Sequence, residues 1–352
     1  MTPRGDLVVV GLGARIATGI DALTTAMTVR ARKSFVRESR FVDRAGEPIA
    51  LSFVSSIDDD GVGRERFVAL AAPAMTEAVQ SWARVRFTSR GHAIPPVPLL
   101  LATPAEVDPA DPRGAKLMAA LAERSGIAID VARSKVVAQG RAAGVVAIEQ
   151  AAARIAKGED ELILVGGVDS YFDADRLEAL DAARRLHGPA TENGFIPGEG
   201  AAFVLLASRR RAGSDVKHGS IVGVGTEREP RPFGSNEPCH ALGITLAMKR
   251  AIAALGTARI GWALSDVVGE RHRVDEWLFG SGRIQHSLTA DMKHETPLLL
   301  TGDLGAATAP LLVVLACAFW NAGCAAAELA LVAAHSDGAE RGALLLASES
   351  SS

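Results

Sequence analysis

The sequence predicts an α/β protein made of two similar halves. Short apolar, β-branched runs end at glycines and are followed by alanine-rich segments with helical spacing, a pattern typical of buried strands that alternate with helices. Hydrophobic residues make up 48% of the 352 residues but aromatic residues only 5%, so the core must consist of Ala, Val, Leu and Ile. A chain of this length can hold one large body or two halves.

The stretch from Lys135 to Ser170 shows this alternation most clearly. It predicts a strand over 135–138, a helix over about 143–157 and a second strand over 161–165. Arg141 therefore falls where a strand ends and a helix begins. The free N–H groups of a helix start favour an anion or a thiolate, so this corner suits a catalytic nucleophile, yet the residue there is an arginine.

Near the N-terminus, the run Leu7–Val10 predicts a strand that ends in a tight turn at Gly11–Gly13, followed by a helix from about Asp21 to Arg32. The two glycines resemble the start of a dinucleotide-binding loop. However, Ile16 stands where that fingerprint needs its third glycine, and no clear acidic residue follows at the required distance. We therefore expect no nucleotide cofactor.

The cysteines and charges place further bounds on function. Cys239, Cys317 and Cys324 form no Cys-x-x-Cys pair, which suits a reducing cytoplasm, and the last two are expected to be inert core thiols. The histidines lack the spacing of metal ligands, so no metal is expected. A net charge of −3 gives no reason to expect nucleic acid, and we expect neither a signal peptide nor a membrane span.

Four segments of the first half recur in the second half in the same order. The pairs are 7–13 with 220–225, 135–144 with 297–307, 162–170 with 329–337, and 198–208 with 340–348. Chance similarity could produce one or two such pairs, whereas four in order predict a duplication, with halves at 1–212 and 213–352. A pseudo-twofold axis would then bring two equivalent helix starts, at Arg141 and Asp303, together at the centre.

These segments make the chain similar to the β-ketoacyl synthases of the thiolase superfamily. The similar segments are 8–13, Gly144 with its alanine-rich helix, 166–170, 197–201 and 301–307. The resemblance implies a thiolase-like fold, in which duplicated βαβαβαββ halves stack in five αβαβα layers, and it implies a homodimer. It also implies a fatty acid or polyketide setting.

The sequence departs from this family at the positions that carry its chemistry. The family's nucleophilic cysteine corresponds to Arg141, and a guanidinium cannot attack a thioester because it has no available lone pair at neutral pH. The family's second histidine corresponds to Asp303 and the lysine before it to Leu298. The first histidine corresponds to Glu270, or to His272 with a shift. Losing all four groups would remove thioester condensation.

Several interpretations of these replacements remain open at this point. Arg141 and Asp303 have changed in a complementary sense, so we expect a buried ion pair that fills the former active site. Alternatively, Arg141 acts with Glu270 in anion binding or acid/base chemistry. Some family members carry glutamine in place of the cysteine, and Gln139 lies two positions away. Glu199, in a glycine-rich turn, is expected to be a structural acceptor.

The sequence therefore predicts a ketosynthase-like protein without condensing activity. It would serve as a dimeric scaffold or as the non-catalytic partner of another subunit, with an acyl carrier protein as a further partner. The alternative is a cysteine-independent enzyme that acts on acyl thioesters as a decarboxylase, hydrolase or acyltransferase.

Overall fold

The computed structural model describes residues 5–87, 95–106, 111, 114–189, 191–213 and 216–349. The first half contains β1 (Leu7–Ile16), α1 (Ala22–Arg30), β2 (Arg37–Val42), β3 (Pro48–Leu51), α2 (Gly63–Phe87), β4 (Leu99–Thr103), α3 (Ala115–Ser125), β5 (Lys135–Ala138), α4 (Ala143–Ala156), β6 (Leu162–Ser170), α5 (Ala174–Ala182), β7 (Glu199–Ser208) and α6 (Arg209–Ala212). The second half contains β8 (Gly219–Arg228), α7 (Leu242–Ala251), β9 (Ile260–Ser265), α8 (Arg271–Arg283), β10 (Leu288–Glu295), α9 (Leu298–Thr301), α10 (Thr308–Asn321), β11 (Leu329–His335) and β12 (Glu340–Ala347).

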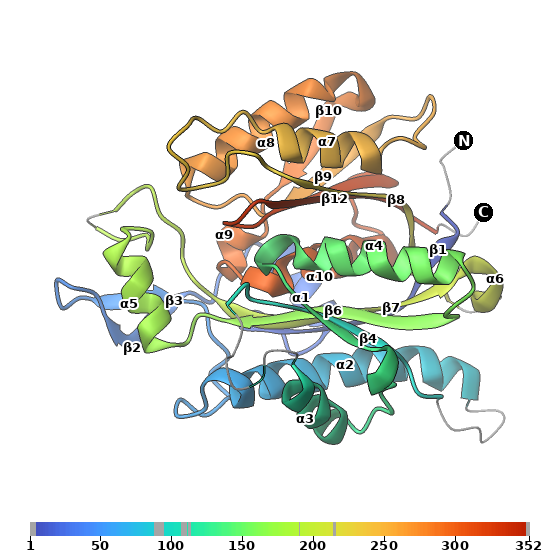
Figure 1. The fold of residues 1–352 in the computed structure, drawn as a ribbon, viewed down its shortest axis with the longest axis horizontal. Coiled ribbons are helices and arrows are strands. Elements are labelled where there is room, and N and C mark those ends of the chain that lie inside the picture. Colours follow the sequence, from blue (N-terminus) through green and yellow to red (C-terminus); the bar gives the residue numbers. More distant parts are fainter. Residues whose placement is uncertain are drawn as a thin grey trace.

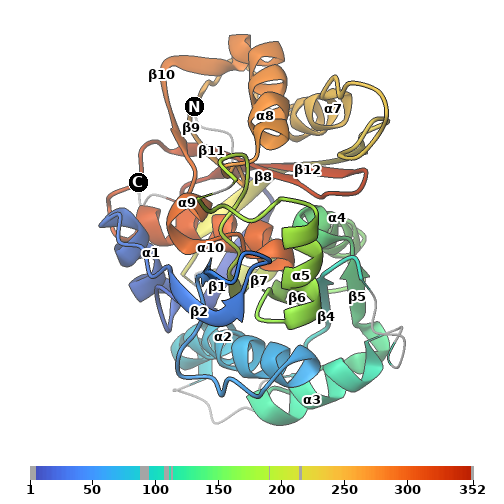
Figure 2. The same ribbon diagram turned by 90° about the vertical axis from the view of Figure 1, so that its left-hand side faces the viewer.

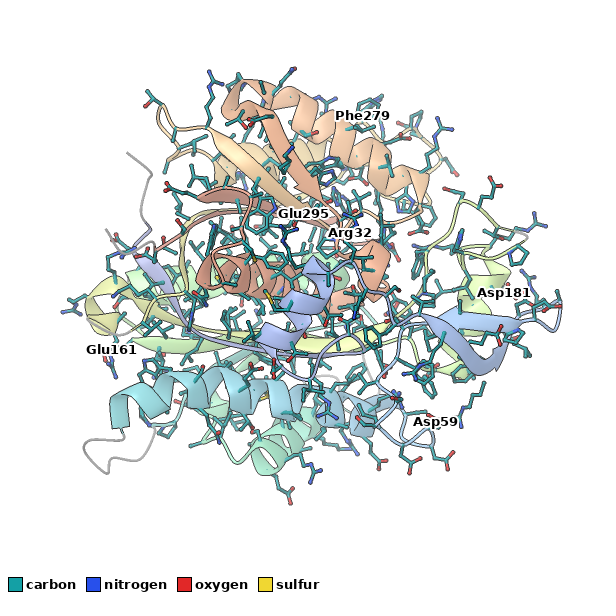
Figure 3. The ribbon with its side chains drawn as sticks, turned by 180° about the vertical axis from the view of Figure 1, so that it is seen from behind. Arg32, Asp59, Glu161, Asp181, Phe279 and Glu295 are labelled. Carbon is teal, nitrogen blue, oxygen red and sulfur yellow. The ribbon has the colours of Figure 1, made fainter. Side chains whose placement is uncertain are left out.

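The elements stack in five layers (Figure 1). Helices α7 and α8 cover one outer face, α2 and α3 cover the other, and α4 and α10 lie between the two sets of strands (Figures 1 and 2). Charged residues such as Asp59 and Glu161 lie at the outer margin (Figure 3). The α/β fold class predicted from the sequence is therefore confirmed.

The strands follow a duplicated order. The sheet runs β10-β9-β11-β12-β8-β1-β7-β6-β4-β5, so two series of five strands meet where β1 and β8 pair along Leu7–Val9. In both series the first three strands from the outer edge run parallel to one another, and each of the next two runs antiparallel to the strand before it. The boundary between residues 212 and 213 stays a prediction.

The central layer explains why the most apolar segment of the chain is a helix that lacks a polar face. Helix α10 is buried on all sides from Thr308 to Phe319, because one series of strands lies on each side of it and α4 lies beside it. Such a helix is apolar all round. No helix in the described part of the chain combines the length and apolar character needed to cross a membrane.

Two predictions about local structure are wrong. Gly11 and Gly13 lie inside β1 rather than in a turn, and their role is close packing: a Cβ on Gly13 would lie 1.9 Å from the Ala74 carbonyl oxygen of α2. The strand expected at 297–300 is instead the short helix α9, and the strand of that half is β10. Strand β10 has polar, largely exposed side chains because it lies at the edge of the sheet, so it carries no apolar signal.

Candidate functional site

Two equivalent corners of the fold meet at the centre of the molecule. In the first, β5 leads through a tight turn at Gly140–Ala142 into α4, and Arg141 lies in that turn with 3% of its surface exposed. In the second, α9 leads to α10, and Asp303 lies in the connection, fully buried. The predicted ion pair is present, because Arg141 Nη2 lies 2.6 Å and Nε 2.8 Å from Asp303 Oδ2.

This ion pair is part of a larger cluster that the sequence did not reveal. Arg273 Nη2 lies 2.8 Å from Asp303 Oδ2 and 2.9 Å from Glu270 Oε2. Arg185 Nε and Nη2 donate to the two carboxylate oxygens of Glu270 at 2.7 and 2.9 Å. We name these side chains, together with Asp337, the central charge network: Arg141, Arg185, Arg273, Glu270, Asp303 and Asp337.

Asp337 closes the central charge network on the solvent side. Arg141 Nη1 donates to Asp337 Oδ1 at 2.9 Å, and Arg185 Nη1 donates to Asp337 Oδ2 at 2.8 Å. The Asp337 side chain is 41% exposed, whereas the side chains of its two arginine partners are 4% and 11% exposed. Three guanidinium groups thus face three carboxylates, and the network is electrically balanced.

The network holds the carboxyl groups of Asp303 and Asp337 in the ionised form. Burial alone would raise the pKa of Asp303, but the positive charges of Arg141 and Arg273 outweigh it and hold this pKa well below its usual range. The same balance, with Arg141 and Arg185 as the cations, lowers the pKa of Asp337. A carboxylate that stays ionised and saturated by arginines is a poor general base.

An aromatic ring lies among the three arginines. The guanidinium carbons of Arg185 and Arg273 each lie 5.4 Å from the centroid of Phe195, and that of Arg141 lies 5.7 Å away. Arg141 Nη2 also donates to the Tyr171 hydroxyl oxygen at 3.1 Å. The ring therefore stabilises the buried positive charges and fills space beside them.

The other positions singled out from the sequence lie around this cluster. Glu270 is joined to Arg141 through other members of the network, by way of Arg185 and Asp337 and by way of Arg273 and Asp303, and no direct contact links the two residues expected to act together. His272 stacks on Phe233 at a centroid distance of 4.3 Å, and burial lowers its pKa to about 4.

Three further residues complete the comparison with the sequence-based predictions. Leu298 is buried in α9. The side-chain oxygen of Gln139 is buried and makes no hydrogen bond with the described residues. Glu199 accepts hydrogen bonds from the Val54 N–H at 2.8 Å and from Arg66, so its predicted role as a structural acceptor is confirmed.

The sequence offered no direct signal for Arg185 and Arg273. Each is one arginine among many. Among the described residues 27 polar or charged ones are buried, and the sequence alone could not rank polar positions by burial without knowing which helices meet. Asp337 ends a segment that pairs with 162–170 in the internal duplication, and this was the only hint of its place at the centre.

Two groups of possible metal ligands occur among the described residues. Glu270, His272 and Asp337, here named the donor trio, place one ligand atom each within 4.8 Å of one another, and so do Glu229, Cys239 and Glu276. In both groups an arginine already holds a carboxylate: Arg185 binds both acids of the donor trio, and Arg341 binds Glu276 of the second group through two hydrogen bonds. A cation would have to displace these guanidinium groups, so neither group fits a metal as it stands.

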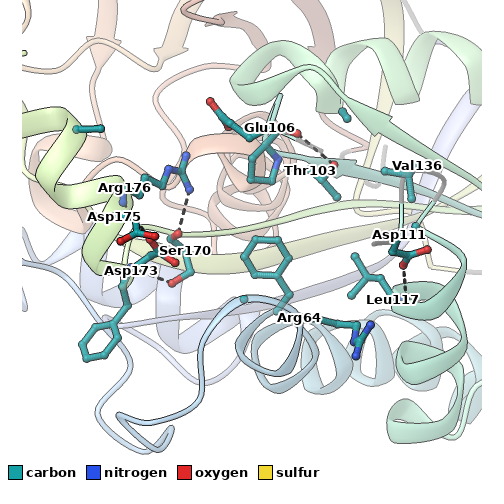
Figure 4. A pocket seen from close by; sticks show the side chains of 17 residues that line it. Arg64, Thr103, Glu106, Asp111, Leu117, Val136, Ser170, Asp173, Asp175 and Arg176 are labelled. Atoms are coloured by element: carbon teal, nitrogen blue, oxygen red, sulfur yellow. Dashed lines mark hydrogen bonds between the residues drawn. The ribbon is translucent and has the colours of Figure 1, made fainter. Parts of the chain in front are cut away.

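A hollow along the described residues lies away from the central charge network. It has a volume of about 590 Å³ and opens between α2, α3 and α5, at the ends of β4, β5 and β6 (Figure 4). None of the six network residues lines it. We name it the lower hollow, after its place in Figure 1.

Comparisons with known proteins define the class. Residues 132–212 match the family model for the beta-ketoacyl synthase, N-terminal domain, and this segment contains Arg141, α4 and Arg185. A chain of the AntDE:AntF complex, a type II PKS acyl-carrier protein with its ketosynthase, is 15% identical at a TM-score of 0.78, covering 99% of this chain and 100% of that chain. The chain is therefore similar to ketosynthases in its fold, and one segment of it matches their N-terminal domain.

Two further structures belong to ketosynthase pairs with chain length factors. The ishigamide ketosynthase/chain length factor is 19% identical at a TM-score of 0.72, covering 98% of this chain and 99% of that chain. The complex of ApeO with its chain length factor ApeC from Xenorhabdus doucetiae is 14% identical at a TM-score of 0.75, covering 98% of each chain. At these identities the likeness concerns the fold.

Proposed function

We propose that the protein is a ketosynthase-like subunit that has lost condensing activity and acts as a dimeric scaffold or as the non-catalytic partner of another subunit. The observation that carries this proposal is the central charge network, which occupies the corner where the family places its nucleophile. Arg141 and Asp303 bind each other there instead of a substrate.

The chemistry of the network argues against acyl transfer. A covalent acyl intermediate needs a nucleophile with an available lone pair, and a guanidinium paired with two carboxylates offers none. Each arginine and each carboxylate of the network is engaged by partners within the network, so an incoming thioester would find neither a free base nor a free cation.

The closed environment of Arg141 supports the scaffold over the cysteine-independent enzyme. An enzyme would need an open route from the surface to this residue, wide enough for a pantetheine arm. Arg141 is 3% exposed, and the lower hollow does not reach the network. The burial of Arg141 therefore favours the scaffold over the second candidate.

The two outer strands of the sheet suggest where a partner binds. Strand β5 is short and mostly apolar, with Lys135 as its single charged residue, whereas the opposite edge strand β10 carries charges such as Asp291 and Lys293. Charged side chains protect an edge against pairing, so β5 is the edge better suited to join a second sheet. We propose that a second copy, or a related ketosynthase-like subunit, pairs with β5.

The first experiment tests for acyl transfer. The full chain is incubated with an acyl-CoA or an acyl carrier protein thioester, and intact-mass spectrometry is combined with a measurement of released thiol. We expect neither a covalent adduct nor turnover. Turnover without an adduct would establish the second candidate, the cysteine-independent enzyme.

The protein's own cysteines require a control in this experiment. Cys239 and Cys324 are partly exposed, so slow chemical acylation could mimic catalysis, although burial raises the pKa of Cys239 to about 11. The double variant Cys239→Ser/Cys324→Ser removes this background. An adduct that persists in it at a group of the central charge network would contradict the proposal.

The second experiment tests assembly. Sedimentation of the full chain should give twice the 36.7 kDa mass of one chain, or a mixed dimer when a ketosynthase from the same gene neighbourhood is co-expressed. A monomer under both conditions would contradict the scaffold role.

A further inference from the structure

The lower hollow has the form of a binding site for a small molecule. Strands β4, β5 and β6 run parallel, and the hollow lies where they end, at Thr103, Ala138 and Ser170. Ligands of α/β proteins bind at such carboxyl ends because the loops there can shape a cavity. Its volume of about 590 Å³ is in the range of sites that hold drug-sized molecules.

The wall of the lower hollow is mainly apolar. Phe67 from α2, Leu117 from α3, Val136 from β5 and Phe172 after β6 contribute to it, and Pro104 follows the end of β4. Burying an apolar body against such a wall is favourable in proportion to the area covered. The wall therefore selects for a molecule with a hydrocarbon or ring portion.

The charged side chains that line the hollow are mostly acidic. Four carboxylates line it, at Glu106, Asp111, Asp173 and Asp175, and Figure 4 shows them on more than one side of the hollow. Of the two lining arginines, Arg176 is neutralised by Asp169, a residue outside the lining, at 2.5 Å.

Among the described lining residues Arg64 is the one other cation, and Lys116, outside the lining, also acts on Asp111, so carboxylates still outnumber cations around the hollow. Asp111 and Asp173 also accept hydrogen bonds from backbone N–H groups, of Leu117 and Arg176, which holds them in place at the starts of α3 and α5. The electrostatic potential in the hollow is therefore negative, which attracts a cation and repels an anion. The aromatic ring of Phe67 adds to the attraction for a cation.

From this geometry we propose that the lower hollow binds a small molecule with an apolar body and a positively charged amine. This function does not depend on the proposed loss of acyl transfer, because the hollow contains no residue of the central charge network, although Val136 and Ala138 of β5, the edge proposed for pairing, line it. Binding of an amine can therefore be present or absent whether or not the chain transfers acyl groups.

Three probes that share one hydrocarbon body test the charge preference. Octylammonium, 1-octanol and octanoate are titrated calorimetrically into the full chain at low ionic strength and at concentrations where none forms micelles. We expect octylammonium to bind most tightly, at least tenfold more tightly than octanoate, and its affinity to fall when salt is added.

Charge variants test which residues create the preference. The double variant Glu106→Gln/Asp175→Asn removes two exposed charges at the rim of the hollow, from residues outside the core. The loss of each charge should weaken the binding of octylammonium by about threefold. The matched control is Glu178→Gln, an exposed acid on α5 outside the lining, which should leave the affinity unchanged. Equal losses in the double variant and in the control would contradict the assignment to the hollow.

A blocking variant tests the location. Ala179 lines the rim on the exposed side of α5, so Ala179→Phe should narrow the entrance and weaken all three probes, whereas Ala182→Phe, on the same helix outside the lining, should not. The proposal is wrong if octanoate binds as tightly as octylammonium, if none of the probes binds at millimolar concentration, or if Ala179→Phe leaves binding unchanged.

Discussion

Replacing Asp303 by Asn should strongly destabilise the protein. Asp303 is fully buried and pairs with both Arg141 and Arg273, so Asp303→Asn leaves the central charge network with three cations and two anions. Removing one partner of a buried ion pair costs about 3–5 kcal/mol, because the remaining charge stays in a poorly solvated place. In the wild type the Gly305 N–H donates to Asp303 Oδ1 at 2.9 Å, and the amide oxygen of the asparagine can still accept this hydrogen bond. The loss of stability therefore reports mainly the missing charge.

The matched control removes both charges. In Arg141→Met/Asp303→Leu the remaining residues, Arg185 and Arg273 with Glu270 and Asp337, are again balanced, and apolar side chains of similar size fill the space. Such replacements are often neutral in stability, so the double variant should be more stable than the sum of the two single losses predicts, by about 2 kcal/mol or more.

Urea unfolding of the wild type, Asp303→Asn, the single variants Arg141→Met and Asp303→Leu, and the double variant provides the assay. The sign of the pH dependence follows from the lowered pKa of Asp303: its contribution is present above the usual carboxyl value of 3.8 and is lost as the pH falls toward the lower pKa of the folded state. The difference between wild type and Asp303→Asn should therefore be constant near neutral pH and shrink below 3.8. A loss under about 1 kcal/mol, or single losses that simply add, would refute the view that this cluster depends on charge balance.

Three further predictions concern other parts of the molecule. Burial raises the pKa of Glu77 to about 7, so wild-type stability should fall as the pH rises from 4.5 to 7, by on the order of 1–2 kcal/mol, and Glu77→Gln should remove this slope in urea titrations across that range. Gly13→Ala forces a Cβ against the backbone of α2 and should lower the free energy of unfolding by about 1–3 kcal/mol or more, whereas Gly282→Ala, exposed in α8 with open space around it, should raise it by up to about 1 kcal/mol. Arg185→Ala removes the guanidinium that bridges the two carboxylates of the donor trio and leaves each with one arginine, Arg273 on Glu270 and Arg141 on Asp337, so this variant should bind Zn²⁺ by calorimetry more tightly than the wild type; equal affinity would show that the Arg185 guanidinium is not what excludes the ion.

The agreement between sequence and structure is best where local pattern and tertiary environment favour the same outcome. The strand expected at 135–138 is β5, and the helix expected at about 143–157 is α4, at 143–156, because both have the periodicity of buried elements. Strand β6 extends to Ser170, beyond the predicted end, since glycines at 166 and 167 interrupt its apolar run. Those glycines are needed for contact: a Cβ on Gly167 would lie 2.3 Å from the Ala306 carbonyl oxygen.

The pairing of Arg141 with Asp303 could be predicted because a duplicated sequence places equivalent corners at a common axis. The remaining members of the central charge network could not. Arg185 follows α5, Arg273 is in α8 and Asp337 follows β11, and no spacing along the chain relates these positions. A buried charge only becomes recognisable when its partner is known, and apart from Glu270, which lies three residues before Arg273, each partner here comes from another layer or loop.

By itself, then, the sequence determined the α/β class, the order of most strands and helices, and the presence of an arginine where β5 leads into α4, because these depend on local periodicity and on single residue types. The tertiary structure decided how charge is balanced at the centre, why Gly11 and Gly13 are glycines, and where a hollow remains. These features depend on how closely separate elements approach one another, and the distance between two segments is a property of the packed fold rather than of either segment.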